Sequence, residues 1–288
     1  MKYSLFSIFF VFALGINSLS AQVRTGSNDC VFQPEDRKIA EGKLALFSSK
    51  SDLNIADLIA EIGLSFLGTP YVAATLENGM EEKLVINLRE LDCTTFAENC
   101  LALARTVKLG KTDFESFAVE LECVRYRDGI RNLYLSRLHY FSDWIHNNSA
   151  KKFISEEPNL KGEKQDKTIN FMSTHADSYP VLKANPQLLP MLEKQETAIT
   201  STGFYYFPKS NSAKLLDVLH HGDIIGLTTS MEGLDITHVG IIVKKDNQFH
   251  LLHASLSGKK VVLSDGPVTD FIKPESKNTG IEIARPLF

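Results

Sequence analysis

The stretch Leu91–Cys100, with the sequence LDCTTFAENC, predicts a loop that turns into a helix with a cysteine at the turn. Asp92 is a good helix N-cap, and the residues after it place apolar side chains on one helical face, at Phe96, Cys100, Leu103 and Val107. This periodicity continues to about Lys108. Because the positive end of a helix dipole favours negative charge, we expect Cys93 to be biased towards the nucleophilic thiolate. The stretch therefore indicates a cysteine hydrolase, provided that two further residues complete the site.

The order of the predicted elements indicates an α+β fold. Helical periodicity covers residues 35–47, 52–67 and 112–124, and residues 136–147 are a further helix candidate with the only Trp of the chain. Prolines divide the stretch before Gly203 into short helical pieces. Strand candidates rich in β-branched and aromatic residues follow, at Phe204–Phe207, Ile224–Thr228, His238–Val243, Phe249–Ala254 and Val261–Leu263. Helices followed by strands favour α+β over alternating α/β.

Composition and the first residues bear on location and partners. The 288 residues carry a net charge of -4 without a basic run, which argues against a nucleic-acid partner. Lys2, the apolar stretch Leu5–Ile16 and small residues up to Ala21 predict a secretory signal peptide over residues 1–21. The apolar stretch is shorter than the ~20 residues that span a bilayer, although an uncleaved membrane anchor is the alternative. We expect a periplasmic or secreted protein whose mature chain is not inserted in a membrane.

In a compartment outside the cytosol, cysteines can form disulfides. If Cys93 is catalytic, then Cys30, Cys100 and Cys123 can form at most one intramolecular disulfide, and the sequence leaves the pairing open. Cys100 lies within the apolar stripe, which predicts core packing. The chain has no Cys-x-x-Cys pair, which argues against a structural zinc site or a thioredoxin motif.

Two histidines are predicted on one face of a β-hairpin. Residues 235–243 and 248–255 read as strands joined by a turn at 244–247, with His238 on the first strand and His253 on the second. A Lys245-Asp246 loop places the two histidines directly opposite each other, and an Asp246-Asn247 loop makes them diagonal neighbours. Since side chains alternate with period two, both registers bring the imidazoles within reach of each other. His250 then points to the opposite face.

These residues suit nucleophilic catalysis. The thiol of Cys93 attacks a carbonyl, His238 moves the proton, and His253 fixes the tautomer of His238. Two other interpretations stay open from the residues alone. Cysteine and two histidines are also a legitimate zinc ligand set, and single cysteines and histidines are common in binding or structural proteins.

Four motifs in order resemble the NlpC-type cell-wall peptidases, a papain-like cysteine hydrolase superfamily. They are Gly68-Thr69-Pro70-Tyr71, Asp92-Cys93-Thr94-Thr95-Phe96, His238-Val239-Gly240-Ile241 and His253-Ala254-Ser255. The usual Ser-Gly after the cysteine is Thr94-Thr95 here, and His238 follows Cys93 by 145 residues (238 − 93), more than in compact members. Residues 125–129, 136–144 and 171–175 resemble the N-acetylmuramoyl-L-alanine amidase-like branch.

The resemblance implies a papain-like fold with N-terminal helices packed on a C-terminal antiparallel sheet. Residues 22–288 then form one domain with an insertion at about 123–203. Its implied activity is an exported amidase, without cofactor or metal, that cleaves the bond between N-acetylmuramic acid and L-alanine in soluble, probably anhydro, muropeptides. Two alternatives remain: an endopeptidase acting between D-glutamate and the diamino acid of stem peptides, and an inactive peptidoglycan-binding protein.

The resemblance also implies site residues. It makes Cys93 the nucleophile, His238 the base and His253 the third member. Tyr71 and Asp92 would shape the pocket beside the cysteine, and the Cys93 N–H would serve as an oxyanion donor. The insertion would wall the cleft and contribute substrate-binding side chains, which we expect at Arg137, His139, Tyr140 and Trp144.

Overall fold

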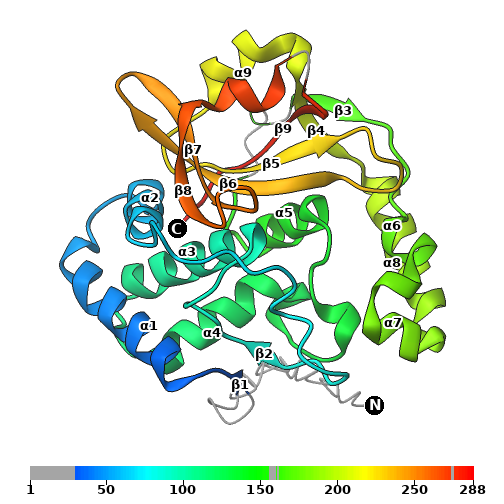
Figure 1. Ribbon diagram of the computed structural model, residues 1–288, viewed down its shortest axis with the longest axis horizontal. Coiled ribbons are helices and arrows are strands. Elements are labelled where there is room, and N and C mark those ends of the chain that lie inside the picture. The colour runs from blue at the N-terminus through cyan, green and yellow to red at the C-terminus, as the bar shows by residue number, and fades with distance from the viewer. Residues whose placement is uncertain (1–29, 156–159, 161, 274–275) are drawn as a thin grey trace, which may run out of the picture.

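A seven-stranded sheet lies against a layer of helices in this computed structural model, which describes residues 30–155, 160, 162–273 and 276–288 (Figure 1). The predicted signal peptide lies outside the described residues. The helices come first along the chain and most of the strands come last, so the prediction of helices combined with a large antiparallel sheet is confirmed.

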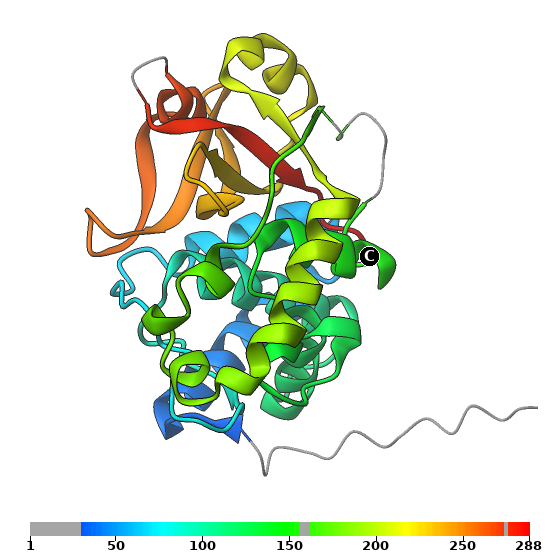
Figure 2. The same ribbon diagram turned by 90° about the vertical axis from the view of Figure 1, so that its right-hand side faces the viewer.

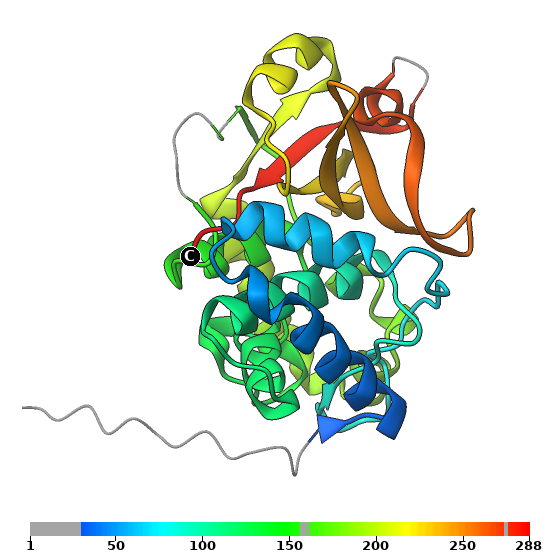
Figure 3. The same ribbon diagram turned by 90° about the vertical axis from the view of Figure 1, so that its left-hand side faces the viewer.

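The helices of the first half form one layer. They are α1 (Pro34–Phe47), α2 (Ile55–Leu64), α3 (Cys93–Lys108), α4 (Phe114–Arg125) and α5 (Phe141–Ala150). Helix α3 is the central one, and every residue from Thr95 to Val107 is buried. Figure 3 shows α1 and α2 on the outer side of this layer. A short parallel pair, β1 (Cys30–Val31) with β2 (Leu84–Val85), lies at the opposite end from the sheet.

The sheet is antiparallel, with the order β3-β4-β9-β5-β6-β7-β8. Its strands are β3 (Glu163–Gln165), β4 (Phe204–Pro208), β5 (Ile224–Thr229), β6 (Ile236–Lys245), β7 (Gln248–Ser255), β8 (Lys260–Pro267) and β9 (Asn278–Ala284). Five of these strands were predicted. Strand β9 was not, although it pairs with both β4 and β5 in the middle of the sheet.

The chain segment that connects the helices of the first half to the later strands runs down one side of the molecule. It contains α6 (Phe171–Thr174), α7 (Pro180–Ala184) and α8 (Leu189–Thr202), and Figure 2 shows α8 on the side that faces the viewer. Short helical pieces were expected here, but α8 is longer than the prolines suggested. Pro190 lies in the first turn of α8, where a missing N–H costs no hydrogen bond.

The helix predicted at 136–147 begins later, at Phe141. The backbone of Tyr140 is extended, and Arg137 makes an isolated antiparallel bridge with Tyr126. The carboxylate of Asp235 accepts hydrogen bonds from the backbone N–H (2.9 Å) and hydroxyl (3.0 Å) of Ser142, which stabilises the new helix start.

Three buried clusters hold the fold together. The main core joins α1–α4 to the inner face of the sheet, a second lies between the outer face and α9 (Ser212–Val218), and a third fills the segment around α8. A Cβ at Gly63 of α2 would lie 2.8 Å from a methyl group of Leu252 on β7. Helix and sheet therefore approach so closely there that only glycine fits without a shift of its neighbours.

Candidate active site

Cys93 is the first residue of α3, and a capping box fixes this helix start. The Thr95 N–H donates to the Asp92 carboxylate at 2.8 Å, and the Asp92 N–H donates to the Thr95 hydroxyl at 3.0 Å. Reciprocal bonds of this kind satisfy backbone donors that a helix end leaves without partners. The predicted N-cap is confirmed, and Thr95 is the partner that sequence reasoning missed.

The surroundings of the Cys93 thiol differ from the expectation. The side chain is half-buried, and burial together with the adjacent Asp92 carboxylate raises the pKa of the thiol. The Val239 N–H and Thr94 donate hydrogen bonds to the sulfur and oppose that rise in pKa without cancelling it. The expected bias towards thiolate is therefore wrong for the resting site, because burial and Asp92 outweigh the helix dipole. The raised pKa favours the neutral thiol in the resting site.

The Val239 contact also shows where Cys93 lies relative to the predicted histidines. Val239 follows His238 directly on β6, so the start of α3 abuts the strand that carries the predicted base. Residues far apart in sequence thus meet at the junction of the two layers.

The two histidines form a hydrogen-bonded pair. Lys245 faces Gln248 across a two-residue Asp246-Asn247 turn, and both turn residues have positive φ, 50° and 61°. This is the second of the two predicted registers. His238 and His253 are consequently diagonal neighbours on one face, and Nε2 of His238 lies 2.6 Å from Nδ1 of His253. The two rings are nearly perpendicular, at 88°.

Both imidazoles are held neutral. Burial lowers the pKa of His238 to about 4, with a smaller contribution from His253, and burial lowers the pKa of His253 to about 4. The ring of Phe271 contacts His253 edge-on at a centroid distance of 5.6 Å. With Nε2 of His238 bonded to His253, Nδ1 is the ring nitrogen that remains to serve as a base.

Tyr71 joins this group from the loop that precedes α3. Its backbone pairs with Leu91, just before Asp92, and its N–H donates to the Lys259 carbonyl at 2.9 Å. Burial raises the pKa of the Tyr71 phenol, and the neighbouring Cys93 and Asp92 side chains raise it further. The structure therefore brings Tyr71 and Asp92 to the cysteine.

The four predicted residues of the middle segment contact other protein residues, although Nε1 of Trp144 has no hydrogen-bond partner among the described residues. Arg137 is 5% exposed and pairs with Glu77, and the Tyr140 hydroxyl donates to Glu196 at 2.7 Å. His139 contacts the Tyr134 carbonyl at 3.0 Å, and Trp144 is buried and stacks on Phe141. Within the described residues, no hydrogen bond joins these four side chains to Cys93, His238 or His253, and their substrate roles stay predictions.

Other predicted features are readily located. Cys100 is fully buried in the main core, as its place in the apolar stripe predicted. No cluster of three or more His, Cys, Asp or Glu side chains in the described part of the chain is arranged to hold a metal ion. None of the described helices is long and apolar enough to cross a membrane.

Comparison with known proteins places this arrangement in context. Residues 61–281 match the model of the AmiA-like family, described as N-acetylmuramoyl-L-alanine amidase-like. A solved structure of an N-acetylmuramoyl-L-alanine amidase from Bacteroides uniformis is 36% identical, with a TM-score of 0.74 over 81% of this chain and 99% of that one. A putative xylanase from Bacteroides fragilis is 40% identical, with a TM-score of 0.70 over 77% and 98% of the two chains.

A protein from Legionella pneumophila shares the fold at 20% identity, with a TM-score of 0.64 over 87% of this chain and 95% of that one. A comparison with curated proteins found no match to this chain. The family match and the Bacteroides uniformis structure support a hydrolase that acts on amide bonds.

Proposed function

This chain belongs to the AmiA-like family of N-acetylmuramoyl-L-alanine amidase-like proteins, and from that premise we propose that it is an exported cysteine amidase. Its substrate would be the amide bond between N-acetylmuramic acid and L-alanine in soluble muropeptides, with anhydro ends as the preferred form. One observation carries the mechanism: Cys93 begins α3 beside the Val239 amide, while the neighbouring His238 is bonded to His253 at 2.6 Å.

Proton transfer accompanies attack, because the resting thiol and imidazoles are neutral. As Sγ of Cys93 bonds to the muramoyl carbonyl carbon, the thiol proton passes to Nδ1 of His238. The carbonyl oxygen gains negative charge, which the Cys93 N–H at the helix start stabilises. The His253 ring, bonded to Nε2, orients the imidazole and supports the charge that it acquires.

The second half of the reaction restores the enzyme. The carbon–nitrogen bond breaks, and His238 gives its proton to the alanine nitrogen, so that the peptide leaves as an amine. A muramoyl thioester remains on Cys93. Water then attacks the thioester carbonyl, with His238 as base. The carbon–sulfur bond breaks, the muramic acid carboxyl group is released, and the thiol regains its proton.

We also propose the papain-like arrangement and the 123–203 insertion that the sequence suggests. Support comes from chain order, since a helix bearing the cysteine precedes the strands bearing the two histidines, with α5–α8 between them. Tyr71 and Asp92 flank the thiol and are proposed to shape the substrate pocket.

The test is cleavage of a purified muropeptide with an anhydromuramic end, with product masses measured. Release of the intact stem peptide and the free sugar is expected, and Cys93→Ala should abolish it. Cys123→Ala is the matched control, since that buried thiol lies at the end of α4, away from the capping box of α3.

Other products would overturn the proposal. An L-Ala-D-Glu dipeptide still attached to sugar would show the endopeptidase, and binding without cleavage would show an inactive peptidoglycan-binding protein. Undiminished cleavage by Cys93→Ala would remove the cysteine mechanism. Loss of activity with a chelator would support the zinc alternative.

Export has a separate test. When the full chain is expressed with an intact N-terminus, removal of residues 1–21 should appear as a mature protein outside the cytoplasm that begins near Gln22. A full-length chain retained in the membrane fraction would favour the uncleaved anchor.

A further inference from the structure

The loop 72–92 connects Tyr71 to the catalytic cysteine and has little regular structure of its own. Its ends are tied together, since the Val72 N–H donates to the Leu91 carbonyl at 3.2 Å. Between them, β2 is the one strand, and Ala74 and Gly79 have positive φ. Ordering the residues of such a loop costs backbone conformational entropy. Contacts from outside the loop must therefore hold its middle in place.

Apolar packing holds residues 84–91, where Leu84, Ile86, Leu88 and Leu91 are buried in the main core, but it holds little of residues 74–82. A hollow of about 810 Å³ lies against the loop, with Met80, Glu81 and Glu82 on one side and Leu133 and Leu188 among the residues on the other. The Met80 side chain is 59% exposed. Polar contacts are therefore the main interactions that can hold this part of the loop in place.

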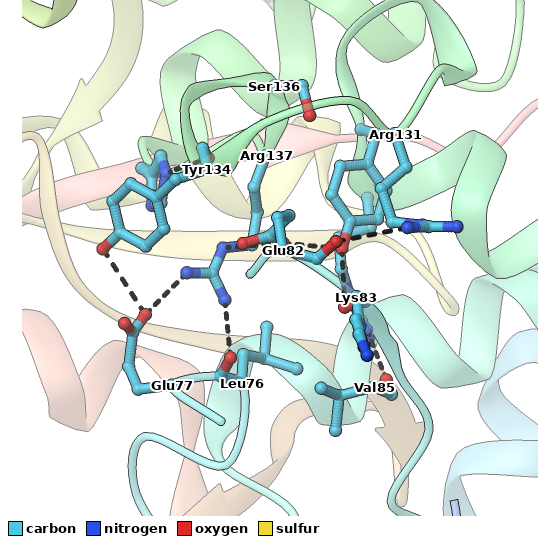
Figure 4. A network of polar contacts seen from close by, with 12 residues as sticks. Leu76, Glu77, Glu82, Lys83, Val85, Arg131, Tyr134, Ser136 and Arg137 are labelled. Atoms are coloured by element: carbon cyan, nitrogen blue, oxygen red, sulfur yellow. Dashed lines mark hydrogen bonds and ion pairs between the residues drawn. The ribbon is translucent and has the colours of Figure 1, made fainter. Parts of the chain in front are cut away.

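Three arginines of the segment 125–137 supply such contacts, and Figure 4 labels Arg131 and Arg137. Arg125 donates to the Val85 carbonyl at 2.6 Å, Arg131 to the Glu82 carbonyl at 3.2 Å, and Arg137 to the Leu76 carbonyl at 3.2 Å. Each guanidinium thus binds a different backbone oxygen of the same loop. Arg125 also pairs with Glu98 of α3 at 2.7 Å, which links the loop to the helix that begins with the nucleophile.

Arg137 makes the most complete set of loop contacts. Besides the Leu76 carbonyl, it binds the Glu77 carboxylate at 2.6 Å and lies 3.7 Å from that of Glu82. The Tyr134 ring lies 4.9 Å from the guanidinium carbon, and the Tyr126 hydroxyl donates to Glu82 at 2.7 Å. Figure 4 shows the guanidinium between the two carboxylates. Both Nη donors bind the loop, and Nε, which makes no hydrogen bond within the described residues, is buried 3.7 Å from Glu82, which leaves little for a substrate carboxylate.

We propose that Arg137 is a positioning residue, which clamps the loop 72–92 and so fixes the wall beside Cys93. This inference rests on the proposed amidase function and replaces the substrate-binding role expected of Arg137. Because the Tyr71–Leu91 bridge and the Asp92 cap hold the loop ends independently, loss of the clamp loosens mainly the middle. Substrate then meets a less ordered wall, and KM rises more than kcat falls.

The test compares Arg137→Gln with Arg127→Gln, a matched control whose guanidinium binds Asp143 of α5 instead of the loop. In Arg137→Gln, amide hydrogen exchange of residues 74–82 should become about tenfold faster, and KM should rise about tenfold with kcat within threefold. Arg137→Lys should not restore the wild-type values, because one ammonium cannot reproduce the planar fork of the guanidinium. Arg127→Gln should leave loop exchange unchanged.

Glu77→Gln keeps the test informative if Arg137→Gln does not fold. Its side chain is partly exposed, and the change removes the charge of the carboxylate that Arg137 binds. Faster loop exchange in this variant supports the clamp. Wild-type loop exchange in every folded Arg137 and Glu77 variant overturns it, and a raised KM with wild-type exchange would indicate direct substrate binding by Arg137. Exchange is measured without substrate, so it decides the clamp even if wild-type protein cleaves no muropeptide and the proposed function fails.

Discussion

In the contact of α3 with β6 and β7, the polar side chains singled out from the sequence face one another. In the segment 123–203, they face protein partners instead. His238 and His253 bond to each other, whereas Tyr140 bonds to Glu196 and Arg137 to Glu77. The first region gathers its polar groups at a junction of layers, and the second uses them to hold its own irregular chain together. A polar residue within a specialised segment is thus weak evidence for substrate contact.

The largest expected effect is a loss of activity on substitution of His238, in the first region. His238→Ala should lower kcat/KM at least about 10³-fold, because the proposed mechanism gives the thiol proton to His238, whereas His253 only orients that ring. His250→Gln is the matched control, since His250 lies on β7 but contacts the Ser264 carbonyl. Kinetics with a muropeptide measure both variants. Activity of His238→Ala within tenfold of wild type would contradict the assignment of the base.

In the segment 123–203, we expect a substitution to lower stability instead of substrate binding. Trp144→Ala should lower the free energy of unfolding by about 3–5 kcal/mol, because it leaves a cavity where the indole stacks on Phe141. Urea denaturation gives this value. Trp144→Phe should lower the free energy of unfolding much less, since a ring still fills most of the space. If Trp144→Ala keeps its stability but loses substrate affinity, the indole contacts substrate and the comparison fails.

The histidine pair predicts how stability depends on pH. The pKa of each ring is lowered from 6.5 to about 4, so the unfolded imidazoles bind protons in that interval while the folded ones stay neutral. The free energy of unfolding should therefore fall as pH decreases from about 6.5 to 4.

Denaturation over a pH series measures this slope. A His238→Gln/His253→Gln double variant should have a shallower slope, whereas His146→Gln, at an exposed position, should keep the wild-type slope. Equal slopes in all three proteins would show that the pair is not buried as described.

The smallest expected effect concerns Asp92. Asp92→Asn keeps a capping oxygen but removes the charge that raises the pKa of Cys93. The rate of thiol alkylation near pH 8 should rise a few-fold, because more thiolate is present. Thr94→Val should have the opposite effect, since it removes a hydrogen bond that lowers the pKa. A slower rate in Asp92→Asn would mean that loss of the cap outweighs loss of charge.

Local patterns predicted much of the fold and the centre of the site. Alternation identified β6 and β7, and apolar spacing together with Asp92 identified the start of α3. The hairpin register stayed open, because the choice depended on whether Asp246 and Asn247 both adopt positive φ. Strand β9 was missed, because Glu282 between Ile281 and Ile283 gives only a short alternation that Gly280 and Ala284 do not extend.

What the sequence could not provide is long-range pairing. The buried state of Arg137, Tyr140 and Trp144 depends on partners such as Glu77, Glu196 and the sheet, and no local spacing reveals those partners. The start of α5 likewise depends on Asp235, far along the chain. The same limit hid Phe271, which packs on His253.

The neutral state of Cys93 has a consequence for durability. Peroxide oxidises thiolates much faster than thiols, and outside the cytosol few reductants would reverse such damage. A half-buried sulfur that burial and Asp92 keep protonated presents little of the oxidisable form between turnovers. In the proposed mechanism, the same feature makes Cys93 depend on His238 for activation, and it would also preserve the thiol in the reduced state until substrate arrives.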